Sequence, residues 1–240
     1  TFITGIAVGN EVFMTRDKTL VSHLLLAMQN LHLALHTLNL TNIIISSPMS
    51  LSILDTSSPP SSATFRYPTL MYPYLSFLAN SSSPFMANVY PFFAYKDNPS
   101  TVSLQYALFQ SNPGIDDPTT NLTYYNMFDA QMDAVYSAIS ALGFNDITLL
   151  VSETGWPSNG GSDEVGATLA NAQIYHANLV QHVTSKAGTP LHPDKTPEIY
   201  LFALFNENLK PGPVSERNYG LFWPNGTKVY SFDFAPASSS

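Results

Sequence analysis

The sequence contains no cysteine and very little positive charge. Lysine and arginine together number 9 among 240 residues, against 17 aspartate and glutamate residues, so the formal net charge is −8. The arginines, Arg16, Arg66 and Arg217, are too few for the phosphate-neutralising surface that nucleic-acid binding requires. The lack of cysteine excludes disulfide scaffolds, thiol nucleophiles and thiolate metal sites. We therefore expect neither a nucleic-acid partner nor a cysteine-based active site.

Long apolar runs are also missing, although 45% of the residues are hydrophobic. No run reaches the ~18 residues that a membrane helix needs, so we expect no integral membrane span in this chain. The chain opens on Thr1 without a basic leader segment, and its first residues read as the middle of a domain. We expect an N-terminally truncated sequence. Glycosylation sequons favour a secreted glycoprotein; they stand at Asn39, Asn80, Asn121 and Asn225.

Five short apolar runs have the composition of β-strands that are covered on both faces. They are nearly continuous in apolar and β-branched residues and lack the alternation of a strand with one wet face. Helical patterns separate them, and such an alternation requires a parallel sheet with right-handed crossovers. The runs are 2–8, 42–47, 86–94, 147–152 and 198–205.

Four segments between these runs carry apolar residues at intervals of three or four positions, which is typical of a helix with one buried face. The third of them is followed by Gly143, a residue suited to a helix C-cap. A Ser- and Pro-rich stretch, 54–67, precedes the second, and we expect a long loop there rather than a domain linker. The helical segments are 20–38, 70–78, 124–142 and 163–186.

Two parallel architectures compete for this alternation. A doubly wound sheet normally carries a glycine-rich phosphate turn after an early strand, but Gly5 and Gly9 are followed here by the acidic Glu11. A (β/α)8 TIM barrel carries polar functional residues where its strands end, as every predicted strand does. The sequence therefore predicts the barrel. At about 250 residues for eight units, five units leave about 90 residues of barrel in front of this chain.

Three glutamates follow predicted strands, namely Glu11, Glu153 and Glu207. The carboxyl ends of barrel strands meet at one face, so we expect these side chains to share a cleft. A pair of carboxyl groups, one protonated and one ionised, is the equipment of glycoside hydrolysis. For each glutamate alone, helix capping or pairing with a lysine, such as Glu207 with Lys210, is the alternative interpretation.

Amide and aromatic side chains near these glutamates suit a sugar ligand. Asn10 precedes the first glutamate, where its amide would hydrogen-bond a sugar hydroxyl. Trp156 and Tyr90 lie near two strand ends, and flat aromatic rings suit the C–H faces of pyranose rings. Phe92 and much of Phe93 are expected in the core instead.

Four segments, taken as a set, resemble the plant glucan endo-1,3-beta-glucosidases of glycoside hydrolase family 17. The resemblance extends from the first residue to about residue 234. It implies that residues 1–234 supply strands 4 to 8 of a (β/α)8 barrel, and that residues 235–240 begin a Ser/Pro-rich linker. The segments are VGNEVF (8–13), NVYPFFAY (88–95), VSETGWPS (151–158) and FALFNENLKPGPVSERNYGLFWPNGTKVY (202–230).

The same resemblance implies a role for each of the strand-end residues. Glu11 looks like the general acid/base at the end of the fourth strand, and Glu153 looks like the nucleophile at the end of the seventh. Retention of configuration places such carboxyl groups ~5–5.5 Å apart. Glu207 and Lys210 resemble the family's supporting pair. The residues expected to bind substrate are Asn10, Tyr90, Trp156 and Asn206.

The function implied by the resemblance is endo-hydrolysis of β-1,3-glucans of the callose or laminarin type. We expect a secreted monomer of the plant cell wall, with a role in plant defence, whose partner is the glucan polysaccharide and which needs no cofactor. Family members often carry a carbohydrate-binding module or a lipid-anchor signal after such a linker. Two alternatives stay open: hydrolysis of mixed-linkage 1,3;1,4-β-glucan, and a catalytically weak glucan-binding or wall-remodelling role.

A metal site is not expected. His32 and His36 have the i, i+4 spacing of a helical metal-binding pair. However, the glutamate that accompanies such a pair is absent at position 33, where the sequence has Leu33. Both histidines also flank the apolar stripe of a predicted outer helix.

Overall fold

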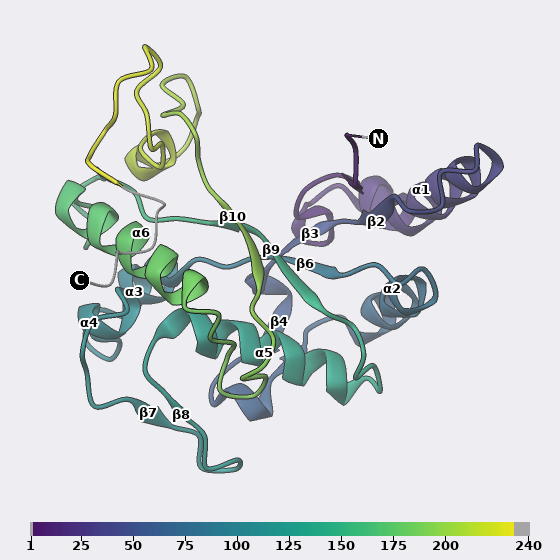
Figure 1. Cartoon of the computed structure of the whole chain (residues 1–240), viewed down its shortest axis with the longest axis horizontal. Helices are drawn as coiled ribbons and strands as arrows, with labels where there is room; N and C mark the ends of the chain where they lie inside the picture. The colour runs from purple at the N-terminus through teal and green to yellow at the C-terminus, as the bar shows by residue number, and fades with distance from the viewer. Residues whose placement is uncertain (1, 233–240) are drawn as a thin grey trace. The chain divides into compact units, whose positions relative to one another are not determined.

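The computed structural model describes residues 2–232, so the predicted linker at 235–240 lies outside the described residues (Figure 1). The chain divides into two compact units, and each is described by itself. Unit 1 comprises the described residues up to Asn88 together with Met132–Ser152, and unit 2 comprises Val89–Gln131 and the described residues from Glu153 onward. Strand β9 (Leu149–Thr154) runs across the boundary between them.

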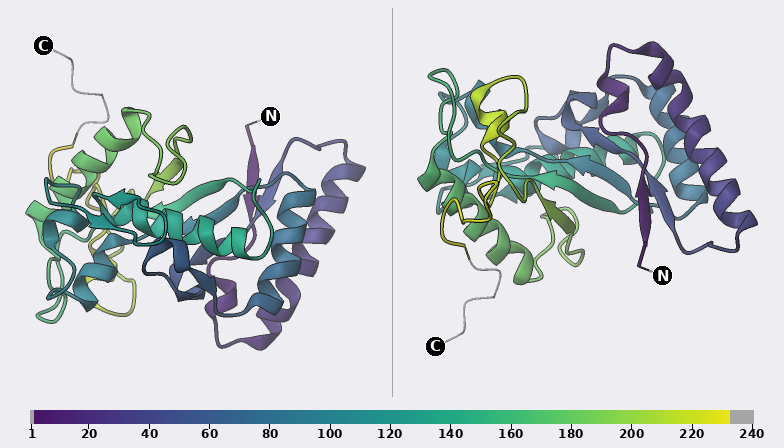
Figure 2. Two further views of the ribbon diagram at one scale, coloured as in Figure 1. Left: turned by 90° about the horizontal axis from the view of Figure 1, so that it is seen from below. Right: turned by 90° about the horizontal axis from the view of Figure 1, so that it is seen from above.

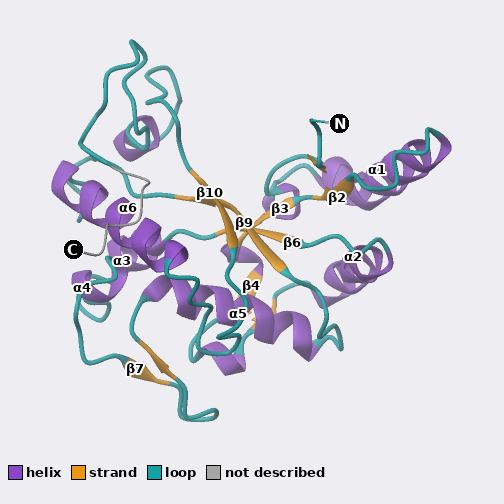
Figure 3. Ribbon diagram, in the orientation of Figure 1, coloured by secondary structure: helices purple, strands orange, loops and turns teal. Residues whose placement is uncertain are grey.

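The main strands of unit 1 pair in parallel, which confirms the predicted kind of sheet (Figure 3). β1 (Gly5–Ala7) pairs with β2 (Ile44–Ser46), and β3 (Pro48–Ser50) pairs with β6 (Phe85–Asn88). The first part of β9 lies on the other side of β6. Aligned residue pairs are Gly5↔Ile44 and Pro48↔Met86. The exposed and intermediate residues of β1 contradict the prediction that this strand is covered on both faces.

Helices α1 (Lys18–Thr37) and α2 (Pro68–Asn80) of unit 1 lie side by side, as both views of Figure 2 show. Asp17 caps α1, because its side chain accepts hydrogen bonds from the backbone N–H groups of its first turn. Only the middle of the predicted apolar stripe is buried, at Leu24 and Met28. The ends of the stripe are 54% exposed at Leu20 and 66% at Leu38.

The Ser- and Pro-rich stretch predicted as a loop carries more regular structure than expected. Strands β4 (Leu54–Thr56) and β5 (Thr64–Phe65) pair antiparallel, and the 3-10 turn η3 (Pro60–Ser62) connects them. Leu54 and Phe65 are both buried. The segment connects a strand to a helix within unit 1, as predicted for a loop rather than a domain linker, and two buried apolar residues at its ends anchor a short hairpin.

Helix α5 (Met127–Ala141) begins in unit 2 and continues into unit 1. It confirms the helix predicted over 124–142. The chain then turns at Gly143, whose φ of 89° is left-handed. Glycine adopts this conformation without steric cost, so the predicted C-cap is also confirmed.

Two predicted strands, one at the end of unit 1 and one in unit 2, and one predicted helix of unit 2 are shorter than expected. The run 86–94 leaves the strand after Asn88, because Pro91 opens a helix at a position where proline suits the first turn. The run 198–205 is a strand only to Leu201. The predicted helix 163–186 begins at Leu169, since the side chain of Thr168 accepts a hydrogen bond from a first-turn N–H.

The elements of unit 2 surround an aromatic core. Trp156, Tyr175, Phe92 and Phe128 are fully buried. Strand β10 lies beside β9, although the alternating exposure of β10 contradicts a strand covered on both faces. The elements are α3 (Pro91–Asp97), α4 (Leu104–Ala107), the antiparallel pair β7 (Ile115–Asp116) and β8 (Thr123–Tyr124), α6 (Leu169–Thr184), β10 (Glu198–Leu201) and the 3-10 turn η4 (Val214–Arg217).

A buried histidine in this core predicts a pH dependence of stability. Burial lowers the pKa of His176 from 6.5 to about 4. Between these two pH values, the unfolded chain binds a proton at this histidine and the folded chain does not. The free energy of unfolding should therefore fall as the pH drops from 6.5 towards 4. We expect His176→Gln to flatten this slope in urea unfolding of the full-length protein. The exposed His23→Gln is the control, and an unchanged slope in His176→Gln would contradict the prediction.

Candidate active site

Glu11 stands four residues after the end of β1 in unit 1, at the start of the 3-10 turn η1 (Val12–Met14). Its backbone is left-handed, with φ 54° and ψ 30°, a conformation that costs a non-glycine residue about 1 kcal/mol. The Glu11 N–H donates to the carbonyl oxygen of Pro48 at 2.8 Å. This hydrogen bond holds the backbone of Glu11 against the start of strand β3.

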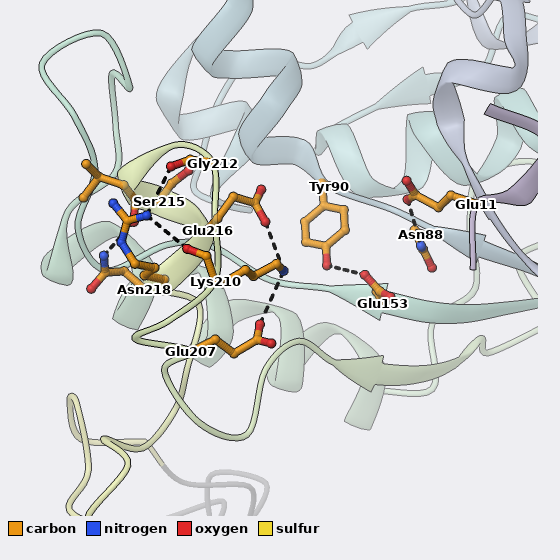
Figure 4. A network of polar contacts seen from close by, with 12 residues as sticks. Glu11, Asn88, Tyr90, Glu153, Glu207, Lys210, Gly212, Ser215, Glu216 and Asn218 are labelled. Atoms are coloured by element: carbon orange, nitrogen blue, oxygen red, sulfur yellow. Dashed lines mark hydrogen bonds and ion pairs between the residues drawn. The ribbon is translucent and has the colours of Figure 1, made fainter. Parts of the chain in front are cut away.

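Asn88 fixes the side chain of Glu11 within unit 1 (Figure 4). Its Nδ2 donates to Oε1 of Glu11 at 2.9 Å and to Oδ1 of Asn10 at 3.1 Å. Its Oδ1 accepts from Oγ of Ser152 at 2.8 Å. Sequence reasoning gave Asn88 no role, although a polar residue at the end of the apolar strand β6 was the available signal. The structure therefore adds Asn88 to the predicted Asn10 and Glu11.

Glu153 is held by Tyr90 within unit 2 (Figure 4). The phenolic O–H of Tyr90 donates to Oε2 of Glu153 at 2.8 Å. The ring of Tyr90 lies against Tyr219 and Phe93, with centroids 5.7 and 5.5 Å apart. Gly155, two residues after Glu153, packs so closely on the backbone of Phe202 that a Cβ atom would clash there. This packing and the phenol together fix the strand end that carries the carboxylate.

Lys210 lies between two carboxylates of unit 2. Its Nζ is 3.3 Å from Oε2 of Glu207 and 3.0 Å from Oε2 of Glu216 (Figure 4). The same nitrogen lies over the ring of Phe202. Partial burial lowers the pKa of Lys210, but Glu216 and Glu207 together raise it above its ordinary value. The predicted pair of Glu207 and Lys210 is therefore a triad. Sequence reasoning missed Glu216, although it falls within the segment 202–230 that carries the resemblance.

Two residues expected to bind substrate are buried instead. The indole N–H of Trp156 donates to the carbonyl of Gly166 at 2.8 Å, and its ring is fully buried. Asn206 is also buried, and its Oδ1 accepts from the N–H of Gly220 at 2.8 Å. Neither side chain presents a surface to a sugar in this structure, and the contacts of both with substrate stay a prediction. Phe92 is buried as predicted, whereas Phe93 is 37% exposed and does not belong to the core.

The predicted site residues thus form three groups in the structure. Asn10 and Glu11 meet in unit 1, whereas Tyr90 meets Glu153 and Glu207 meets Lys210 in unit 2. The two candidate catalytic carboxylates belong to different units. Their expected separation stays a prediction.

Within residues 2–232, no group of three or more His, Asp or Glu side chains is arranged to hold a metal ion. The rings of His32 and His36 lie 4.6 Å apart, and His32 packs edge-on against Phe77.

Among the helices of the described part of the chain, none combines the length and apolar character that crossing a membrane requires.

Comparisons with known proteins identify the family. The family model described as Glycosyl hydrolases family 17 matches residues 2–234. The chain therefore belongs to this family, in agreement with the resemblance inferred from its motifs. Because the family and its solved relatives have the (β/α)8 barrel fold, the parallel strands and crossover helices of this chain are those of a TIM barrel.

Individual relatives agree over nearly the whole chain. "Glucan endo-1,3-beta-glucosidase 14" of Arabidopsis thaliana is 52% identical over 96% of this chain, and "Glucan endo-1,3-beta-D-glucosidase" of Olea europaea is 46% identical over 95%. The chain covers only 60% and 50% of their respective lengths. The solved structure of "CJP38, a beta-1,3-glucanase and allergen of Cryptomeria japonica pollen" is 45% identical, with a TM-score of 0.92 over 97% of this chain and 72% of that one.

Proposed function

We propose that the full-length protein is a retaining endo-hydrolase of β-1,3-glucosidic linkages in glucans. Family membership and the names of the relatives support this class of substrate. The observation that carries the proposal is the contact of Tyr90 with Glu153, because it fixes a strand-end carboxylate while the ring of Tyr90 packs against the exposed ring of Phe93. A carboxylate in this setting suits attack on a sugar carbon.

The proposed reaction has two steps. Protonated Glu11 gives its proton to the leaving glycosidic oxygen while Glu153 attacks the anomeric carbon, so that a covalent glycosyl-enzyme forms and the C–O bond breaks. Glu11, now ionised, then takes a proton from water, which attacks the same carbon and releases Glu153. No cofactor enters either step.

The polar contacts within each unit support these roles. Asn88 orients the carboxyl group of Glu11, and Tyr90 orients that of Glu153. Lys210 places a positive charge between Glu207 and Glu216. We assign substrate binding to Asn10 and Tyr90, and support of the site's charge to Glu207 and Lys210.

The wider organisation is part of the same proposal. We infer that residues 1–234 supply strands 4 to 8 of the barrel. The parallel pairing and the 60% coverage of the Arabidopsis relative support this inference. We also propose that the protein is a secreted monomer that meets β-glucan in the cell wall.

Product analysis on two glucans tests the proposed function. We expect the full-length protein to release oligosaccharides from laminarin and to leave lichenan, a mixed-linkage glucan, nearly intact. A solved relative, 41% identical, is described as one of "two plant beta-glucan endohydrolases with distinct substrate specificities", which makes the second substrate a necessary comparison. Preferential release from lichenan would overturn the linkage assignment. Binding to laminarin without new reducing ends would favour a non-hydrolysing protein.

A further inference from the structure

Glu164 is a buried carboxylate in the segment between β9 and α6 of unit 2, and only 8% of its surface is exposed. Its Oε2 accepts from the N–H of Gly161 at 2.7 Å and from the N–H of Ser215 at 2.9 Å. Its Oε1 accepts from the hydroxyl of Ser215. Burial raises the pKa of Glu164, but these hydrogen bonds and the charge of Lys96 together lower it below its ordinary value. The side chain is therefore an anion tied to η4.

The turn η4 contains Glu216, one of the two carboxylates that pair with Lys210. Ser215, which Glu164 holds, is itself buried and immediately precedes Glu216. Arg217 closes the same segment, because its Nη1 donates to the carbonyl oxygens of Lys210 and Gly212, each at 3.1 Å. The position of Glu216 against Lys210 is thus set by a compact turn.

A second tie joins the same two segments. The N–H and the hydroxyl of Ser158 both donate to the carbonyl of Asn218, at 2.8 and 3.0 Å. Ser158 follows Glu153 by five residues, so this tie and Glu164 both fasten η4 to the chain that leaves β9. The hydrogen bonds of Ser158 involve no charged group. Glu164 carries a charge, which a substitution can remove.

We propose that Glu164 is a positioning residue of the candidate active site, which holds η4 so that Glu216 pairs with Lys210. This role rests on the proposed function. Glu164 is buried beneath η4 and acts through Glu216 rather than on the sugar. A buried carboxylate is costly to desolvate, and here its hydrogen bonds offset that cost. Loss of its charge should loosen the turn and change the surroundings of Lys210.

A double-mutant cycle separates positioning from simple structural support. In the full-length protein we expect Glu164→Gln to lower kcat on laminarin about tenfold with a smaller change in KM, as the loss of a charged hydrogen bond implies. Because Glu164 acts through Glu216, adding Glu164→Gln to Glu216→Gln should lower kcat little further. Ser215→Ala, which keeps the backbone contact, should give a smaller effect in the same direction. Glu198→Gln, the same charge change at an exposed site of unit 2, is the control.

Titration of Lys210 provides a readout that does not depend on activity. Glu216 raises the pKa of Lys210, so Glu164→Gln and Glu216→Gln should both lower it when followed by nuclear magnetic resonance of the ammonium group. An unchanged Lys210 titration in Glu164→Gln, or an equal drop in kcat in both backgrounds, would overturn the positioning role. A wild-type protein that hydrolyses no glucan would instead contradict the proposed function and leave the Lys210 titration to decide the role of Glu164.

Discussion

Replacing Glu153 with glutamine in the full-length protein should reduce laminarin hydrolysis by several orders of magnitude and leave the fold intact. The amide is nearly isosteric with the carboxylate and can still accept a hydrogen bond from Tyr90 Oη. It lacks the negative charge needed to attack the anomeric carbon, so no glycosyl-enzyme can form. Reducing-end release measures the activity, and a thermal melt checks the fold.

Glu198→Gln is the matched control for this substitution, because it makes the same change on exposed strand β10. It should retain wild-type turnover. A Glu153→Gln variant with wild-type turnover would show that another residue is the nucleophile. If Glu153→Gln fails to melt cooperatively, Glu153→Asp replaces it in the test. Aspartate keeps the negative charge, but its shorter side chain holds the carboxylate farther from the sugar.

Replacing Glu11 with glutamine should give a loss that depends on the leaving group. On laminarin, the loss of a general acid should lower kcat by roughly a hundred- to ten-thousand-fold. A dinitrophenyl β-glycoside carries a leaving group that needs no proton to depart. The first step on this substrate, seen as a burst of dinitrophenol, should therefore stay near the wild-type rate. Added azide, which requires no general base, should then restore turnover and appear in the product as a β-glycosyl azide.

The dependence on leaving group distinguishes the two carboxylates. Glu153→Gln should lose activity on both substrates, because both need the nucleophile. If Glu11→Gln lost equal activity on laminarin and on the dinitrophenyl substrate, the acid/base role would have to be reassigned.

Asn88→Ala should show a weaker form of the Glu11→Gln pattern, since Asn88 orients the Glu11 carboxyl group.

The local pattern of the chain was largely predictable from its sequence. Apolar periodicity located α1, α2 and α5, because such a pattern depends only on neighbouring residues. The limits of strands and helices were less predictable. Pro91 ended a run whose hydrophobicity continued to residue 94, and the loop at 54–67 closed as a hairpin through two buried residues.

Sequence by itself determined the family, the order of strands and helices, and the identity of the strand-end glutamates, because all three are written in contiguous motifs. Tertiary structure decided which residues support them. Asn88 reaches Glu11 across 77 positions and Tyr90 reaches Glu153 across 63, and no local pattern encodes such contacts. It also placed Trp156 in the core, because burial depends on what the rest of the fold packs around a side chain.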